Sequence, residues 1–251
     1  MYLCNKQPLI LLVVLLALSL FIGAAWAQEN QVPQENQVPQ MEGKWYILLG
    51  GTYLDLQELN DQMVDGGYSE FGSEFFDFGF GGYGMYKRFI FGGEGVWLNQ
   101  VGDHAKNGDY KGDIFGGYGM FKFGYAVYKN KGFNVFPLLG VGAGGINLRI
   151  ADRQKESFDR VLEEPEQISQ LSRGCLILDL SFGLDHQFDM IKDEEGSSGL
   201  VIGFRAGYAY SPYTWGWSME GESKVTDGPE LGITGPQARI LIGWGGRYKT
   251  E

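Results

Sequence analysis

The chain has 251 residues, of which 44% are hydrophobic and 15% aromatic, and its formal net charge is −11. This acidic balance argues against nucleic acid as a partner, because a phosphate backbone is bound by clusters of lysine and arginine. The 40 glycines and only eight prolines are typical of strands and tight turns, not of a disordered chain.

The N-terminal segment has the features of a secretory signal peptide. Residues 1–27 contain one basic residue near the start, Lys6, an apolar stretch over residues 9–24, and small residues at Ala25 and Ala27. The alternative is a membrane anchor, but the apolar stretch is shorter than the roughly 20 residues that a spanning helix needs. We therefore predict cleavage after Ala27 and export through the secretory pathway.

A tandem repeat follows the leader. The hexapeptide Gln-Glu-Asn-Gln-Val-Pro occurs twice over residues 28–39, and such polar, proline-containing repeats bury too little apolar surface to fold. We assign residues 28–42 as a low-complexity periplasmic linker and residues 43–251 as one barrel domain. Since Cys4 lies in the leader, Cys175 remains alone, and no disulfide within the mature chain is possible.

The domain reads as a series of alternating, glycine- and aromatic-rich segments. Eight strands are expected at residues 44–55, 74–86, 89–99, 113–128, 133–149, 174–188, 199–211 and 237–248. The connections between them alternate between long and short, which places every long connection on one side of a closed antiparallel barrel and every short one on the other. Loops of unequal length on the two sides are typical of transmembrane β-barrels.

The two faces of each strand differ in chemistry. In strand 174–188, leucine and phenylalanine share one face, while Asp179, Asp185, serine and glycine share the other. A face of small residues with a few charges suits a narrow interior, so Asp179, Asp185, Arg205 and Arg239 are predicted to lie inside the barrel, where they can pair. The bulky apolar face then contacts lipid.

Aromatic residues near the strand ends are expected to form girdles at the level of the lipid headgroups. The predicted interface residues are Trp45, Trp97, Tyr210, Trp244 and Tyr248.

On these features, together with a last strand that alternates Ile240, Ile242, Trp244 and Tyr248, the chain resembles the small bacterial outer-membrane barrels of the OmpA and OmpX kind. The resemblance covers residues 44–248 and is architectural, without a diagnostic motif. It implies an all-β, closed, up-and-down barrel in the outer membrane, with outer-membrane lipids, periplasmic chaperones and the barrel-assembly machinery as partners. It implies no oligomeric state.

The sequence offers little catalytic chemistry. The two histidines, His104 and His186, are expected on opposite sides of the membrane, and neither has a serine neighbour in strand register. Acidic residues in segment 100–113 do not match the spacing of a Ca²⁺ loop, so no metal or cofactor is predicted.

A non-enzymatic barrel with a structural or surface role is therefore expected, and three alternatives remain. Gly43-Lys44-Trp45-Tyr46 resembles the opening motif of soluble lipocalin carriers, although the rest of that family's pattern is missing. Lipid A-modifying barrel enzymes are similar in size. Glycines on the inward face are also compatible with a narrow pore.

Overall fold

The computed structural model describes residues 40–102, 104–108, 110–152, 169–219 and 223–249. The predicted leader and residues 28–39 of the predicted linker lie outside the described residues. Strand β1 begins at Gln40, before the predicted domain boundary at residue 43. Among the described residues, no helix combines the length and the apolar character required to span a membrane.

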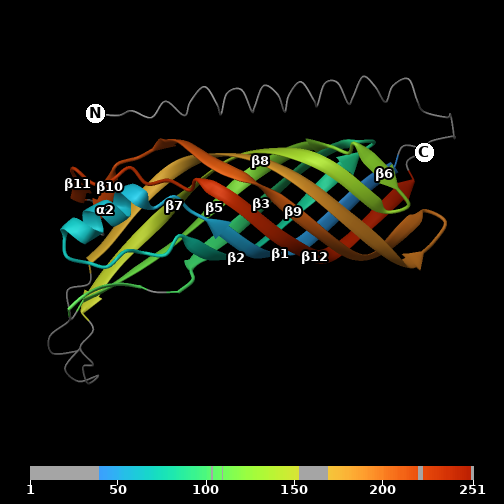
Figure 1. The fold of residues 1–251 in the computed structure, drawn as a ribbon. Helices are drawn as coiled ribbons and strands as arrows, with labels where there is room; N and C mark the ends of the chain where they lie inside the picture. Colours follow the sequence, from blue (N-terminus) through green and yellow to red (C-terminus); the bar gives the residue numbers. More distant parts are fainter. Residues whose placement is uncertain (1–39, 103, 109, 153–168, 220–222, 250–251) are drawn as a thin grey trace. The chain divides into compact units, whose positions relative to one another are not determined.

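Eight long strands of the described chain form a closed ring, and Figure 1 shows them running obliquely around a barrel that lies on its side. In ring order they are β1 (Gln40–Tyr53), β2 (Glu74–Tyr86), β3 (Phe89–Gln100), β5 (Tyr110–Tyr125), β7 (Phe133–Asp152), β8 (Ser169–Lys192), β9 (Gly196–Thr214) and β12 (Gly235–Lys249). All neighbours are antiparallel, and β1 closes the ring by pairing with β12 from Gln40↔Lys249 to Thr52↔Gln237. The structure confirms the predicted fold class.

Connections of unequal length define the two ends of the barrel. The end that carries segments 54–73, 101–109 and 215–234 is called the loop end, and the end that carries turns 87–88, 126–132 and 193–195 is called the turn end. The predicted ten-residue connection at 189–198 is largely strand, because β8 continues to Lys192 and β9 begins at Gly196. These strands remain paired there, apart from a bulge between Asp189 and Ile191.

The loop end has structure of its own that the strand pattern did not predict. Helix α2 (Gln57–Asp65) and the short strands β4 (Ala105–Asn107), β10 (Trp217–Met219) and β11 (Ser223–Val225) lie there, while β6 (Tyr128–Asn130) lies at the turn end (Figure 1). Helix α2 buries only Leu59 and Met63, one turn apart, which is too weak a stripe to read from sequence.

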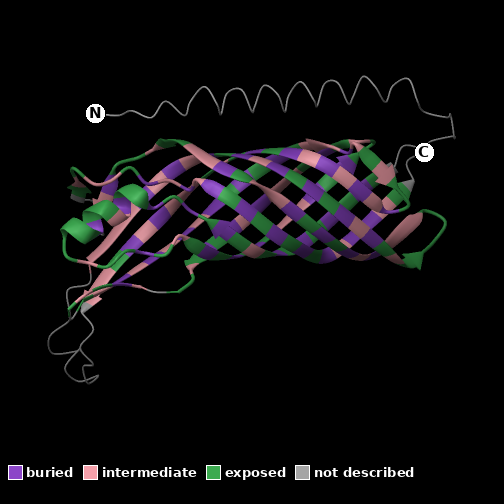
Figure 2. Ribbon diagram, in the orientation of Figure 1, coloured by how far each residue is buried: buried purple, intermediate pink, exposed green. Residues whose placement is uncertain are grey.

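Burial alternates along every long strand, and Figure 2 shows the resulting chequered pattern over the barrel wall. Large apolar side chains occupy the exposed positions, including Phe121 with 71% of its surface exposed and Trp45 with 61%. The intervening side chains point into the barrel and are buried. Because a soluble barrel carries its apolar side chains inside, this arrangement is inverted and matches a barrel surrounded by lipid.

Candidate functional site: the polar interior of the barrel

All four charges predicted to lie inside are buried in the barrel. Asp179 is 3% exposed, Asp185 1%, Arg205 3% and Arg239 2%. The strand period of two places them there, since each occupies the same face as small residues and faces away from the leucine and phenylalanine side. Each comes from a strand paired along its whole length, which holds the side chain in a defined direction.

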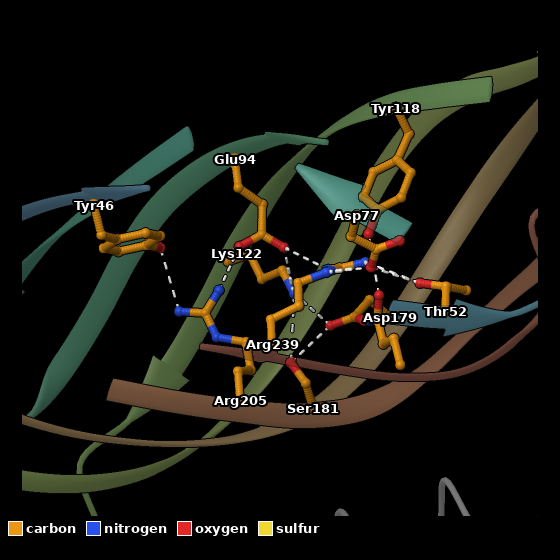
Figure 3. A network of polar contacts seen from close by, with 11 residues as sticks. Tyr46, Thr52, Asp77, Glu94, Tyr118, Lys122, Asp179, Ser181, Arg205 and Arg239 are labelled. Atoms are coloured by element: carbon orange, nitrogen blue, oxygen red, sulfur yellow. Dashed lines mark hydrogen bonds and ion pairs between the residues drawn. The ribbon is translucent and has the colours of Figure 1, made fainter. Parts of the chain in front are cut away.

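Glu94 of β3 is the centre of the interior network (Figure 3). Its carboxylate pairs with Lys122 of β5, 2.9 Å from Nζ, and accepts a hydrogen bond from Nη1 of Arg205 on β9. Nη1 of Arg239 lies 3.8 Å from the same carboxylate. Three cations from three different strands therefore converge on one acid.

Two further acids complete the charge balance of this region (Figure 3). Asp77 accepts hydrogen bonds of 2.7 Å from both Nε of Arg239 and the hydroxyl of Thr52. Asp179 accepts a bond of 2.6 Å from Lys122 and one of 2.8 Å from Ser181. With Glu94, these acids match the three cations, so the region is formally neutral. Neutrality matters because an unpaired charge in a low-dielectric interior is costly.

A second polar cluster lies nearer the turn end. Asp185 of β8 accepts a hydrogen bond of 2.7 Å from Nζ of Lys44, one of 3.1 Å from the amide of Asn134, and one from the hydroxyl of Tyr83. Glu42 lies 3.5 Å from Lys44 and 2.7 Å from Lys129 of β6. The two acids and two lysines again balance, and the cluster ties β1 to β8 and β6.

The predicted pairing among the four interior charges is wrong. Instead, Arg205 pairs with Glu94, Arg239 with Asp77, Asp179 with Lys122, and Asp185 with Lys44. The physical reason is distance across the lumen, since long lysine and arginine side chains reach acids on non-adjacent strands. The sequence does carry a signal for these partners, because the alternation of period two in β1, β2, β3 and β5 also directs Lys44, Asp77, Glu94 and Lys122 inward.

Glycines make room for these bulky side chains. A Cβ added at Gly144 would lie 2.5 Å from Cβ of Tyr118, and one at Gly81 would lie 2.8 Å from Cβ of Glu94. At Gly140 it would lie 3.0 Å from Cβ of Asp179. Large and small residues therefore face each other across neighbouring strands, and a barrel of eight strands is narrow enough for its side chains to fill it.

The loop end is closed by apolar residues. The buried side chains there are Leu54, Leu56, Leu59, Met63, Phe71, Trp217, Leu231 and Ile233. The side chain of Asn60 fixes the first loop, because its amide donates to the Phe71 carbonyl at 3.0 Å and its oxygen accepts from the Phe71 N–H at 2.8 Å. Helix α2 therefore packs over the barrel mouth as a fixed element.

Arg173 of β8 and Trp217 hold the last long loop. The Arg173 guanidinium donates to the carbonyl of Pro229 and, at 2.7 Å, to the hydroxyl of Thr214. The indole N–H of Trp217 donates to the same Pro229 carbonyl at 2.8 Å, and its ring lies 5.8 Å from the Arg173 guanidinium. Trp217 is therefore buried beneath this loop.

The predicted interface aromatics lie on the outer surface of the barrel. Trp45, Trp97 and Tyr248 are exposed, while Tyr210 and Trp244 are partly buried. Trp45 and Trp244 are direct partners in the β1–β12 pairing. The set does not form one cluster, because its members come from strands on different sides of the ring.

The two histidines lie apart. His104 precedes β4 at the loop end, and its Nδ1 lies 2.7 Å from a carboxylate oxygen of Asp113. His186 faces outward on β8 near the turn end, where its ring packs 4.5 Å from that of Phe188. Within the described ranges, no group of three or more histidine, cysteine, aspartate or glutamate residues is arranged to hold a metal ion.

The closed ring, the apolar outer surface and the neutral polar interior define an eight-stranded, up-and-down transmembrane β-barrel.

Solved structures with a similar arrangement include the attachment invasion locus protein Ail of Yersinia pestis, at 12% identity and a TM-score of 0.39 over 84% of this chain and 100% of that one. Neisserial surface protein A is similar at 11% identity and a TM-score of 0.34, over 84% of this chain and 97% of that one. No protein-family model and no curated protein matches the chain.

Proposed function

We propose that this chain is an integral protein of the bacterial outer membrane, with its turn end in the periplasm and its loop end outside the cell. The inverted distribution of side chains carries this proposal. Phenylalanine, leucine and tryptophan cover the barrel wall, while ten charged residues are buried. Water around such a surface would be strongly unfavourable, whereas acyl chains fit it. Short turns at the periplasmic end are typical of these barrels.

The same observation argues against a soluble lipocalin-like carrier. A carrier needs a polar outer surface and an apolar cavity, but Lys44 of the lipocalin-like Gly43-Lys44-Trp45-Tyr46 motif is buried in an ionic cluster. Arg205 and Glu94 occupy the region of the lumen where a carried ligand would lie.

We further propose that the barrel is sealed and has a structural or surface role without enzymatic activity. Salt bridges fill the middle of the lumen, and an apolar cluster with α2 closes the loop end. Helix α2 exposes Glu58, Asp61 and Asp65 on its outer side, so the external surface offered to the surroundings is fixed and acidic.

Heat-modifiable migration tests the barrel, because a closed barrel extracted in detergent migrates faster on a gel before boiling than after. A protein that is released without detergent and migrates at the same position before and after boiling would overturn the proposal.

Planar-bilayer recording tests whether the lumen is sealed. The expected result is no conductance above that of the bare bilayer, and steady single-channel openings would contradict the sealed interior while leaving the barrel in place.

A further inference from the structure

The turn end of the barrel has two halves of opposite charge. Turns 87–88 and 126–132 contain four bases and no acid: Lys87, Arg88, Lys129 and Lys131. The third turn, residues 193–195, consists of three acids, Asp193, Glu194 and Glu195.

Two of the four bases are used inside the protein. Arg88 donates to the carbonyl of Ala126 at 3.2 Å, and Lys129 pairs with Glu42 at 2.7 Å. The ammonium groups of Lys87 and Lys131 are different, since both residues are exposed and neither forms an ion pair with a described carboxylate. These two lysines are therefore the ones available to an external anion.

Both lysines also occupy an unfavourable backbone conformation. Lys87 has φ 56° and Lys131 has φ 45°, and among the described residues Asp227 is the only other non-glycine residue with positive φ. Glycine or asparagine adopts the left-handed region in a tight turn at lower cost. Turn geometry alone therefore favours another residue at both positions, which points to a use for the lysine side chains.

The surroundings place these lysines at a lipid headgroup level. Exposed aromatic rings of Tyr86, Phe89 and Tyr128 lie beside the two turns, and the Lys87 ammonium lies 5.4 Å from the centre of the Tyr86 ring. Phe91, Phe121 and Phe123 continue the exposed apolar surface along β3 and β5. Aromatic rings flanked by an apolar wall on one side and by lysines on the other are typical of a membrane interface.

We propose that Lys87 and Lys131 bind the phosphate groups of anionic phospholipids, such as phosphatidylglycerol, in the inner leaflet of the outer membrane. This inference rests on the proposed membrane location. A lysine close to an anionic lipid surface favours binding by about fivefold. The acidic half of the turn end repels the same headgroups, so anionic lipid gathers on the side of β2, β3 and β5.

Fluorescence quenching tests this directly in the folded barrel. Brominated phosphatidylglycerol and brominated phosphatidylcholine, each mixed into vesicles, quench exposed tryptophans such as Trp45, and the comparison gives the relative association constant of the two lipids. The wild type is expected to prefer phosphatidylglycerol, and Lys87→Gln with Lys131→Gln to lower that preference by at least about fivefold. The matched control, Lys192→Gln with Lys224→Gln, removes two other exposed lysines and should keep the wild-type preference.

Unchanged preference in the Lys87→Gln, Lys131→Gln variant, or an equal loss in the control, would overturn the inference. Should that variant not fold, the lipid preference of the wild type is measured in 1 M salt instead. At that ionic strength the electrostatic screening length falls to about 3 Å, so the attraction between a surface lysine and a lipid phosphate is largely screened. Loss of the preference there supports the inference, and a salt-independent preference overturns it. A wild type that inserts without lipid preference contradicts only this inference, whereas one that does not insert contradicts the membrane location itself.

Discussion

Arg205 of β9 and Glu94 of β3 form an ion pair across the full width of the lumen, because three strands separate β9 from β3 in either direction around the ring. Lys122 and Arg239 approach the same carboxylate from β5 and β12. One acid thus connects two pairs of neighbouring strands, β3 with β5 and β9 with β12, on opposite sides of the ring, and its replacement should affect the whole barrel.

Replacing Glu94 by Gln should lower the free energy of unfolding by about 3–5 kcal/mol, because three cations would lose the acid they share while they remain buried. Urea titration of the barrel in lipid vesicles, followed by tryptophan fluorescence, measures the change. Glu70→Gln is the matched control, since Glu70 is exposed in the first long loop and its replacement should change stability by less than about 0.5 kcal/mol. Equal stability of the two variants would mean that the network does not hold the barrel together.

Two neighbouring glycines should respond in opposite ways to the same substitution. Gly144→Ala places a methyl group 2.4 Å from the Gly117 carbonyl oxygen and 2.5 Å from Cβ of Tyr118, so it should destabilise the barrel by about 1–3 kcal/mol or prevent folding. Gly119→Ala, on the outward face with nothing within 4 Å, should be neutral or stabilising. The fraction of heat-modifiable protein after refolding reports both, and a destabilised Gly119→Ala variant would contradict the assigned faces.

A lysine on the outer wall tests the contact with lipid. Phe121→Lys, on the exposed face of β5 four residues before its end at Tyr125, should cost up to about 2–4 kcal/mol in a bilayer. The control is Gln57→Lys, at an exposed position of α2 beyond the barrel wall, where a small effect is expected. Urea unfolding in vesicles measures both variants. If Phe121→Lys were as stable as the wild type, water rather than acyl chains would surround β5.

Arg173→Ala should release the last long loop without unfolding the barrel. The substitution removes the hydrogen bonds to Pro229 and Thr214 and the contact with the Trp217 ring. The lost contacts should lower the free energy of local opening of this loop by about 1–1.5 kcal/mol. Limited proteolysis is therefore expected to cleave segment 215–234 about five- to tenfold faster. The heat-modifiable band of the remaining barrel should persist. Cleavage at the wild-type rate would show that other contacts hold the loop.

The number of strands and their faces followed from the sequence, because the strand period of two links each side chain to one face. The predicted strand 74–86 matches β2, and the alternation in 174–188 matches the burial of β8. Predicted strand ends were less accurate, since β7, β8 and β9 extend further than predicted. Those extensions are rich in polar residues such as Ser169, Gln170, Ser197 and Ser198, so their hydrophobic alternation is weaker than in the middle of the strands.

Local sequence by itself determined the barrel class, the apolar wall and the inward position of Asp179, Asp185, Arg205 and Arg239. Only the tertiary structure decided which charges meet, as in the pairs Arg205–Glu94 and Lys44–Asp185. It also decided that α2 and Trp217 close the loop end. The reason is that alternation is a property of single strands, whereas contacts across the lumen depend on strand tilt, register and ring closure, which no single strand encodes.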